Sequence, residues 1–232
     1  MRLLDFSIAS IGLCLLGPFF LVVAVVIKLT SAGPVFYQAL RVGQGGRLFR
    51  LYKFRTMVLN ADHLGPPLTS KDDRRITSVG SLLRRTKIDE LPQLLNVIKG
   101  DMNLVGPRAE DPKYLVSYTD RQRQVLAVKP GITSPASVLY RHEEKLLCGP
   151  DKEEAYLRDL LPAKLDIELN YLGRRTLWTD FAVLGQTFLA LFRSSQDLVP
   201  FPQGDSRDGS PRPTFSNRDI SATDAFDSAN EV

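Results

Sequence analysis

The N-terminal end of this 232-residue chain is much more apolar than the rest. No charged residue occurs from Phe6 to Ile27, and a helix over this stretch would be roughly 33 Å long, enough to cross the hydrocarbon core of a bilayer. Gly17 and Pro18 interrupt the stretch, and a proline inside a helix removes one hydrogen bond and bends the axis. The pattern predicts a membrane segment at residues 1–29. It leaves open whether this segment spans the bilayer or, broken at Pro18, re-enters on the same face.

Basic residues follow the apolar segment from Lys28 onward. The positive-inside tendency therefore places the downstream side in the cytoplasm, while the side on which Met1 lies stays open. A cleaved signal peptide is the alternative. It fits less well, because the segment has only Arg2 as a basic n-region, an overlong apolar core and no small-x-small site before Lys28.

Shorter patterns divide the rest of the chain. Strand-like alternation on both sides of Gly43–Gly46 predicts a hairpin, and Pro130–Thr133 is expected to form a loop. Helical spacing predicts helices at residues 55–64, 76–86, 114–128 and 152–172. In the second of these, Leu82 and Leu83 are expected to point inward, and Arg84 and Arg85 outward.

The segment 177–192 is unusually apolar but too short to span a bilayer comfortably. It suits a helix in the membrane interface with Trp178 at headgroup level, or equally a buried core helix. From residue 201 to 232 the chain is rich in polar residues and is expected to be a disordered tail. The sequence thus predicts an α-rich α/β protein with a membrane segment (1–29), one main domain (30–200) and this tail.

Charge and cysteine content limit the possible partners and the compartment. A net charge of +4 suits either anionic lipid or nucleic acid, but the sequence has no helix-turn-helix, zinc-ligand or RNA-binding motif, so no nucleic acid is expected. Cys14 and Cys148 lie far apart in sequence, one in the apolar stretch and one in a polar region. No disulfide between them is expected, which fits a reducing compartment.

The most informative motif contains two adjacent carboxylates, Asp89 and Glu90. Pro92 suits the first turn of a helix and Gly100 is a natural stop, so the pair lies at a helix N-terminus, where negative charge is favoured. Both side chains are therefore expected to be ionised, one able to attack phosphorus and the other able to hold a divalent cation. From the dipeptide alone, helix capping is the more common role, and the surrounding residues decide between the two.

Those surroundings carry a family resemblance. In order, the chain contains RLLD, an apolar segment broken at proline, GPVFYQ, RVGQGG, LYKFRTM, RRTKIDELPQLLNVIKGDMNLVGPR and KPGIT. Over almost all of residues 1–192 it resembles the bacterial sugar transferases, the small monotopic phosphoglycosyl transferases.

The resemblance implies a membrane enzyme of the first step in bacterial glycan assembly. Such enzymes transfer a phospho-sugar from a nucleoside diphosphate sugar, usually a UDP-sugar, to polyprenol phosphate and release UMP. The family's membrane segment is a re-entrant helix-break-helix, and its catalytic domain, with interfacial amphipathic helices, lies on the cytoplasmic face of the inner membrane. The expected partners are the bilayer, both substrates and downstream glycosyltransferases, and the expected cofactor is Mg²⁺.

The family's acidic pair falls on Asp89 and Glu90. Asp89 would form a covalent aspartyl phospho-sugar, and Glu90, with Asp89 beside it, would hold Mg²⁺. The basic positions expected to bind substrate phosphates are Lys53, Arg55, Arg85, Arg108 and, with a weaker match, Arg141.

The chain departs from the family pattern in two places. Ala109 replaces a common proline, and Ser134, Pro135 and Ser137 alter the segment after Pro130–Thr133, which leaves the sugar undetermined. Two other functions compete with the enzyme: an inactive membrane scaffold and a hydrolase of nucleoside diphosphate sugars. Retention of both carboxylates argues against the scaffold, and the membrane segment argues against the hydrolase, because a soluble substrate needs no bilayer.

Overall fold

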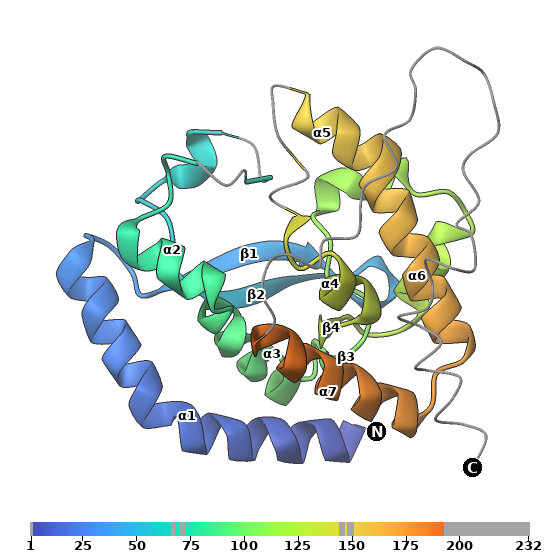
Figure 1. The fold of residues 1–232 in the computed structure, drawn as a ribbon, viewed down its shortest axis with the longest axis horizontal. Coiled ribbons are helices and arrows are strands. Elements are labelled where there is room, and N and C mark those ends of the chain that lie inside the picture. The colour runs from blue at the N-terminus through green and yellow to red at the C-terminus, as the bar shows by residue number, and fades with distance from the viewer. Residues whose placement is uncertain (1, 66–67, 70–72, 144–146, 148–150, 193–232) are drawn as a thin grey trace. The chain divides into compact units, whose positions relative to one another are not determined.

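The computed structural model describes residues 2–65, 68–69, 73–143, 147 and 151–192, all within one compact unit (Figure 1). The predicted tail, 201–232, lies outside these residues. The α-helices are α1 (Arg2–Thr30), α2 (Ser78–Arg85), α3 (Leu94–Lys99), α4 (Pro135–Leu139), α5 (Lys152–Ala155), α6 (Leu161–Gly173) and α7 (Leu177–Phe192). The strands are β1 (Phe36–Val42), β2 (Leu48–Phe54), β3 (Asn103–Val105) and β4 (Gly131–Thr133). Short 3₁₀ segments are η1 (Gln44–Gly46), η2 (Ala61–His63), η3 (Ile88–Gln93), η4 (Pro112–Ser117) and η5 (Gln122–Ala127), and a π turn, η7 (Tyr156–Leu160), precedes α6. The mixed, helix-rich α/β class is as predicted.

Helix α1 is continuous across Pro18, so the predicted helix-break-helix is wrong at the level of secondary structure. A proline removes one backbone hydrogen bond, which bends a helix without ending it. Figure 1 shows this bend near the middle of α1. Within the described residues, α1 is the one helix long and apolar enough to cross a membrane, by length and composition alone.

The hairpin β1–β2 is antiparallel, with Phe36 opposite Phe54 and Val42 opposite Leu48, as the sequence predicted. The edge of β2 that does not pair with β1 is bonded to Asn96 of α3, whose side chain is fully buried. The Asn96 Oδ1 accepts from the Tyr52 N–H at 2.9 Å, and its Nδ2 donates to the Arg50 carbonyl at 2.8 Å. This carboxamide therefore bonds to the β2 backbone as a neighbouring strand would.

Several local predictions are wrong. Pro130–Thr133 is not only a loop, because Gly131–Thr133 forms β4 and pairs in parallel with β3. Residues 114–128 contain two 3₁₀ segments instead of an α-helix, and 55–64 contains one 3₁₀ turn. In α2, Leu83 is buried but Leu82 is 52% exposed, so only one of the two leucines points inward.

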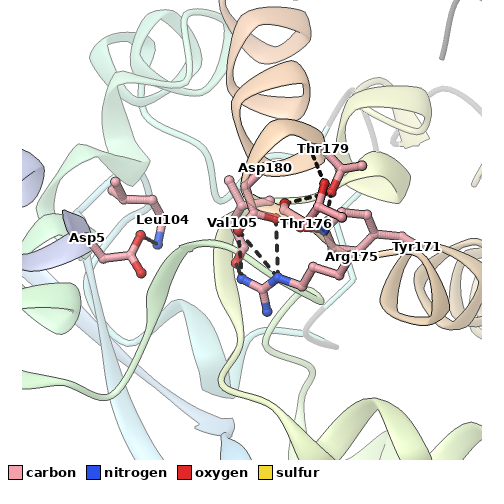
Figure 2. Close-up of polar contacts among 8 residues, drawn as sticks. All are labelled: Asp5, Leu104, Val105, Tyr171, Arg175, Thr176, Thr179 and Asp180. Carbon is pink, nitrogen blue, oxygen red and sulfur yellow. Dashed lines mark hydrogen bonds and ion pairs between the residues drawn. The ribbon is translucent and has the colours of Figure 1, made fainter. Parts of the chain in front are cut away.

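Both ends of α1 contact the rest of the unit. Near the N-terminus, an Asp5 carboxylate oxygen accepts from the Leu104 N–H of β3 at 3.4 Å (Figure 2). The next residue, Val105, accepts from Arg175 through its carbonyl at 2.9 Å, and Arg175 also pairs with Asp180 of α7 at 3.1 Å. The first turn of α1 thus docks where β3 meets the α6–α7 junction.

The other end of α1 is held by Arg55, which follows β2. The Arg55 guanidinium donates to the carbonyls of Ser31 and Ala32 at 2.8 and 2.7 Å, and to the Ser31 hydroxyl at 2.7 Å. Between the two ends, Val23 and Ile27 of α1 pack in an apolar cluster with Phe54 and Leu83.

Helix α7 has a buried, largely polar side and an exposed apolar side. Thr179, Asp180 and Val183 are buried, and Thr187 bonds to Thr133 of β4 at 2.7 Å through the two hydroxyls. The large apolar residues exposed on this helix are Leu177, Trp178, Phe181, Phe188, Leu189 and Leu191. A fully buried core helix is therefore excluded.

The pH dependence of stability should be set in part by Glu168 of α6. This side chain is 3% exposed, and burial raises the pKa of its carboxyl to about 7 from 4.5. Because the folded protein keeps this proton to higher pH than the unfolded chain, the free energy of unfolding should fall as pH rises from about 4.5 to about 7, by at most about 3 kcal/mol. Glu168→Gln, which cannot ionise, should lose this slope and exceed wild type in unfolding temperature at pH 8.

The measurement is thermal unfolding of the detergent-solubilised protein from pH 5 to pH 8. Asp166→Asn, on the same helix but with a half-exposed carboxylate, is the control and should keep the wild-type slope. Equal slopes for wild type and Glu168→Gln would contradict the prediction.

Candidate active site

A cavity of about 870 Å³ brings together residues that are far apart in the chain. Strand β2 contributes Lys53, the turn η3 contributes Asp89 and Glu90, and the segment after β3 contributes Arg108. The carboxylates lie in the first turn of η3, which continues directly into α3. The predicted stop at Gly100 is confirmed, since this residue ends α3 with φ 85°, a conformation that favours glycine.

Glu90 is the centre of an ion-pair cluster. Its Oε1 lies 2.7 Å from the Lys53 Nζ and 3.5 Å from the Arg108 Nη2. The Lys53 and Glu90 side chains are only 20% and 14% exposed, whereas Arg108 is 36% exposed. Lys53 is therefore fixed in the cavity wall, whereas Arg108 can reach a ligand in the cavity.

The environment shifts the pKa values of these groups in different directions. Burial alone would raise the pKa of Glu90, but the charges of Lys53, Arg108 and Lys87 outweigh it and hold that pKa well below the ordinary value. Burial lowers the pKa of Lys53, although Glu90 opposes this.

Asp89 differs from Glu90 although the two are neighbours in sequence. It is 6% exposed, and its Oδ1 has no hydrogen-bond partner among the described residues. Burial raises the pKa of Asp89, with Lys53 partly opposing the shift. A helix N-terminus alone would lower both pKa values, so its expected direction holds for Glu90 and fails for Asp89, where desolvation dominates.

The arginines predicted to bind phosphate fall into three groups. Arg108 and Arg141 line the cavity. Arg55 also lines it, but the guanidinium is engaged by Ser31 and Ala32. Arg85 is exposed at the end of α2 and is not among the cavity-lining residues.

Sequence reasoning missed Arg84, the residue beside Arg85. Arg84 lines the cavity, bonds to the Thr69 hydroxyl, and its charge acts to lower the pKa of Asp89. The expectation that it points outward is wrong, because the face of α2 that carries Arg84 is turned toward the cavity. To assign this face from sequence, one would have to know that only Leu83 of the Leu82–Leu83 pair is buried.

A second polar group lies farther along the same cavity. Glu143 Oε2 and Lys164 Nζ form an ion pair at 2.7 Å, and both residues line the cavity. Burial would raise the pKa of Glu143, but the charges of Lys164 and Arg108 lower it. Arg108 thus interacts electrostatically with two acidic groups, Glu90 and Glu143, and its own pKa is raised, chiefly by Glu90.

The donor set also bears on the expected Mg²⁺. No group of three or more His, Cys, Asp or Glu side chains suited to a metal occurs in the described part of the chain. Mg²⁺ in proteins is commonly held by only one or two carboxylates together with substrate phosphates and water. The unpartnered Oδ1 of Asp89 and the adjacent Glu90 carboxylate, both on the cavity wall, fit that mode of binding.

Comparison with known proteins gives the same assignment as the motifs. A family model described as bacterial sugar transferase matches residues 1–194. The chain is 36% identical over 192 residues to UDP-N-acetylgalactosamine-undecaprenyl-phosphate N-acetylgalactosaminephosphotransferase from Aeromonas hydrophila. The aligned region covers 80% of this chain and 42% of the relative. It is 38% identical over 185 residues to UDP-glucose:undecaprenyl-phosphate glucose-1-phosphate transferase from Xanthomonas campestris pv. campestris, covering 78% of this chain and 36% of the relative.

A shorter relative is matched over more of its length. The identity is 35% over 193 residues to UDP-glucose:undecaprenyl-phosphate glucose-1-phosphate transferase from Caulobacter vibrioides, covering 82% of this chain and 68% of the relative. The chain spans less than half of the first two relatives. The family match over residues 1–194, together with a cavity that holds the acidic pair and its basic neighbours, shows that this chain belongs to the bacterial sugar transferase family.

Proposed function

We propose that this protein transfers a phospho-sugar from a UDP-sugar to polyprenol phosphate and releases UMP. The observation that carries the proposal is the unequal acidic pair: a buried Asp89 oxygen without a partner, beside a Glu90 that is ion-paired to Lys53. The relatives named above are transferases that use undecaprenyl phosphate and, by their names, UDP-sugars. The names of these relatives give different sugars, N-acetylgalactosamine in one and glucose in the other two.

The geometry favours Asp89 as the nucleophile and not Glu90. Glu90 Oε1 is held by Lys53 at 2.7 Å, whereas Asp89 Oδ1 has a free lone pair. An Asp89 oxygen would attack the phosphorus bonded to the sugar, and the bond from that phosphorus to the bridging oxygen would break, so that UMP leaves with the bridging oxygen. An oxygen of polyprenol phosphate would then attack the same phosphorus and release the Asp89 carboxylate unchanged.

The charges around the pair support this chemistry. Arg108 and Arg84, both on the cavity wall, can bind phosphate oxygens by charge-assisted hydrogen bonds. Mg²⁺ held by Glu90 would offset the negative charge of the diphosphate. Lys53 keeps Glu90 ionised and oriented beside Asp89.

We further propose that α1 is re-entrant, with both ends on the face that carries the catalytic domain, the cytoplasmic face of the inner membrane. Asp5 at one end and Ser31 at the other are both hydrogen-bonded to the same compact unit. A straight spanning helix would carry one end across the bilayer, away from that unit. The exposed apolar face of α7, with Trp178, would lie in the same interface.

Asp89→Asn should abolish UMP release without unfolding the protein. The amide keeps the shape of the side chain but lacks the nucleophilic oxygen, so the expected loss is more than about a thousandfold. The assay measures UMP release from a panel of UDP-sugars with Mg²⁺ and undecaprenyl phosphate in lipid nanodiscs. Asp159→Asn, at an exposed ion pair with Arg158, is the matched control and should retain activity. Activity close to wild type in Asp89→Asn would exclude it as the nucleophile.

Arg84 and Arg85 give a paired test of the cavity wall. Arg84→Gln should lower kcat/KM for the donor by roughly tenfold to a hundredfold, about 1.4 to 2.8 kcal/mol, because a cavity cation is lost. Arg85→Gln should change kcat/KM by less than about twofold, because exposed charges contribute little. Steady-state kinetics with the preferred UDP-sugar measures both, and a larger loss in Arg85→Gln would restore the sequence-based assignment.

The re-entrant topology predicts that the N-terminus is accessible from the cytoplasmic side only. Leu3 is 84% exposed, so Leu3→Cys in a background without Cys14 and Cys148 provides a labelling site. A membrane-impermeant maleimide should label it in inverted vesicles and not in intact cells. Val116→Cys, at an 83% exposed position of the catalytic domain, is the control for the cytoplasmic side. Labelling of Leu3→Cys from the periplasm would favour a spanning helix.

A further inference from the structure

Arg55 is bound to the end of the apolar helix and not to the open part of the cavity. The residue is 7% exposed, and its two terminal nitrogens donate to Ser31 and Ala32 at 2.7 to 2.8 Å. Its remaining Nε is also buried and has no hydrogen-bond partner in the described structure. Carbonyls just past a helix C-terminus are favourable partners for a cation, so this contact is a stable clamp.

Gly33 makes room for this clamp. A Cβ on Gly33 would lie 2.1 Å from the Arg55 Nη1, closer than any real contact, and the backbone has φ +116°, which side chains other than glycine rarely adopt. The turn after α1 therefore favours glycine at position 33, where a side chain would both strain the backbone and displace the Arg55 guanidinium. Substituting either one should release the same contact.

The same part of α1 also packs against residues that flank the catalytic groups. Val23 and Ile27 share an apolar cluster with Phe54, and Ile88 packs against that cluster. Phe54 follows Lys53 in sequence, and Ile88 precedes Asp89. Phe20 of α1 meets Phe54 edge to face, with ring centroids 5.1 Å apart. Helix α1 thus packs directly against the part of the domain that carries Lys53 and Asp89, so the depth of α1 in the membrane sets the depth of the cavity.

We propose that Arg55, seated against Gly33, is a positioning residue that fixes the height of the catalytic cavity above the membrane and so governs access of the lipid-bound acceptor to Asp89. The inference rests on the proposed function. Polyprenol phosphate is confined to the bilayer, and its phosphate reaches Asp89 only if the cavity is held at the right distance from the embedded helix. The UDP-sugar arrives from water, and its access does not depend on that distance. Loosening the clamp should therefore impair the acceptor step and spare the donor step.

The two half-reactions separate these steps. The first is measured as exchange of labelled UMP into the UDP-sugar without acceptor, and the second as transfer of phospho-sugar to undecaprenyl phosphate in nanodiscs. In Arg55→Lys and in Gly33→Ala, exchange should stay within about threefold of wild type, while transfer should fall at least about tenfold with a higher KM for the lipid. Arg50→Lys, on the same strand but exposed and bonded to Gln38, is the control and should leave both steps unchanged.

Other outcomes would overturn the inference. A larger loss of exchange than of transfer would make Arg55 a donor-phosphate ligand. An equal loss of both, with a lowered unfolding temperature, would make the clamp structural only. Transfer by wild type without measurable exchange would contradict the proposed covalent intermediate. The positioning role is tested separately in that case, because an unchanged KM for the lipid in Arg55→Lys and Gly33→Ala would exclude it. A wild-type protein that transfers nothing would overturn the proposed function and this inference with it.

Discussion

The carboxamide of Asn96 joins the two elements on which the candidate site is built. Strand β2 pairs with β1 along one edge, and along the other its backbone groups at Arg50 and Tyr52 bond to the fully buried Asn96 side chain. An unpaired buried backbone group is costly, so this side chain fixes the register between β2 and α3. Lys53 follows the bonded part of the strand and Glu90 lies on the turn that leads into α3. Their 2.7 Å ion pair is a consequence of that register.

The difference between the two carboxylates follows from this geometry. Burial opposes the charge of Asp89 and of Glu90 alike, but Lys53 is placed to bond only one of them directly. Glu90 is stabilised as an anion, and Asp89, which also lines the cavity, keeps a buried oxygen without a hydrogen-bond partner among the described residues. Two acidic residues adjacent in sequence thereby differ in environment, since a Glu90 oxygen is paired with the Lys53 cation and an Asp89 oxygen is not.

Sequence reasoning succeeded where the deciding signal was local. The hairpin, the acidic pair in a helical first turn and the glycine stop at Gly100 all depend on neighbouring residues, and all three are present. Strand β4 was missed because Gly131–Thr133 forms a strand only through parallel pairing with β3, which lies outside any local window. Arg84 was confused with Arg85 because two adjacent arginines after two adjacent leucines leave the helical face undetermined. Tertiary contact with the cavity decides it.

Helix α1 is part of the fold and not an independent anchor. Ala9 near its start and Ile27 near its end are 0% and 2% exposed, although most of the large apolar residues between them are not covered by protein. A straight helix of 29 residues would be about 43 Å long and, if it spanned a bilayer, would carry one end away from the domain. Figure 1 shows that α1 is bent instead, and Pro18 lies within that helix. The proline therefore shapes the helix to the domain: it preserves helical backbone bonding in an apolar environment while allowing Asp5 and Ser31 to reach their partners on the same unit.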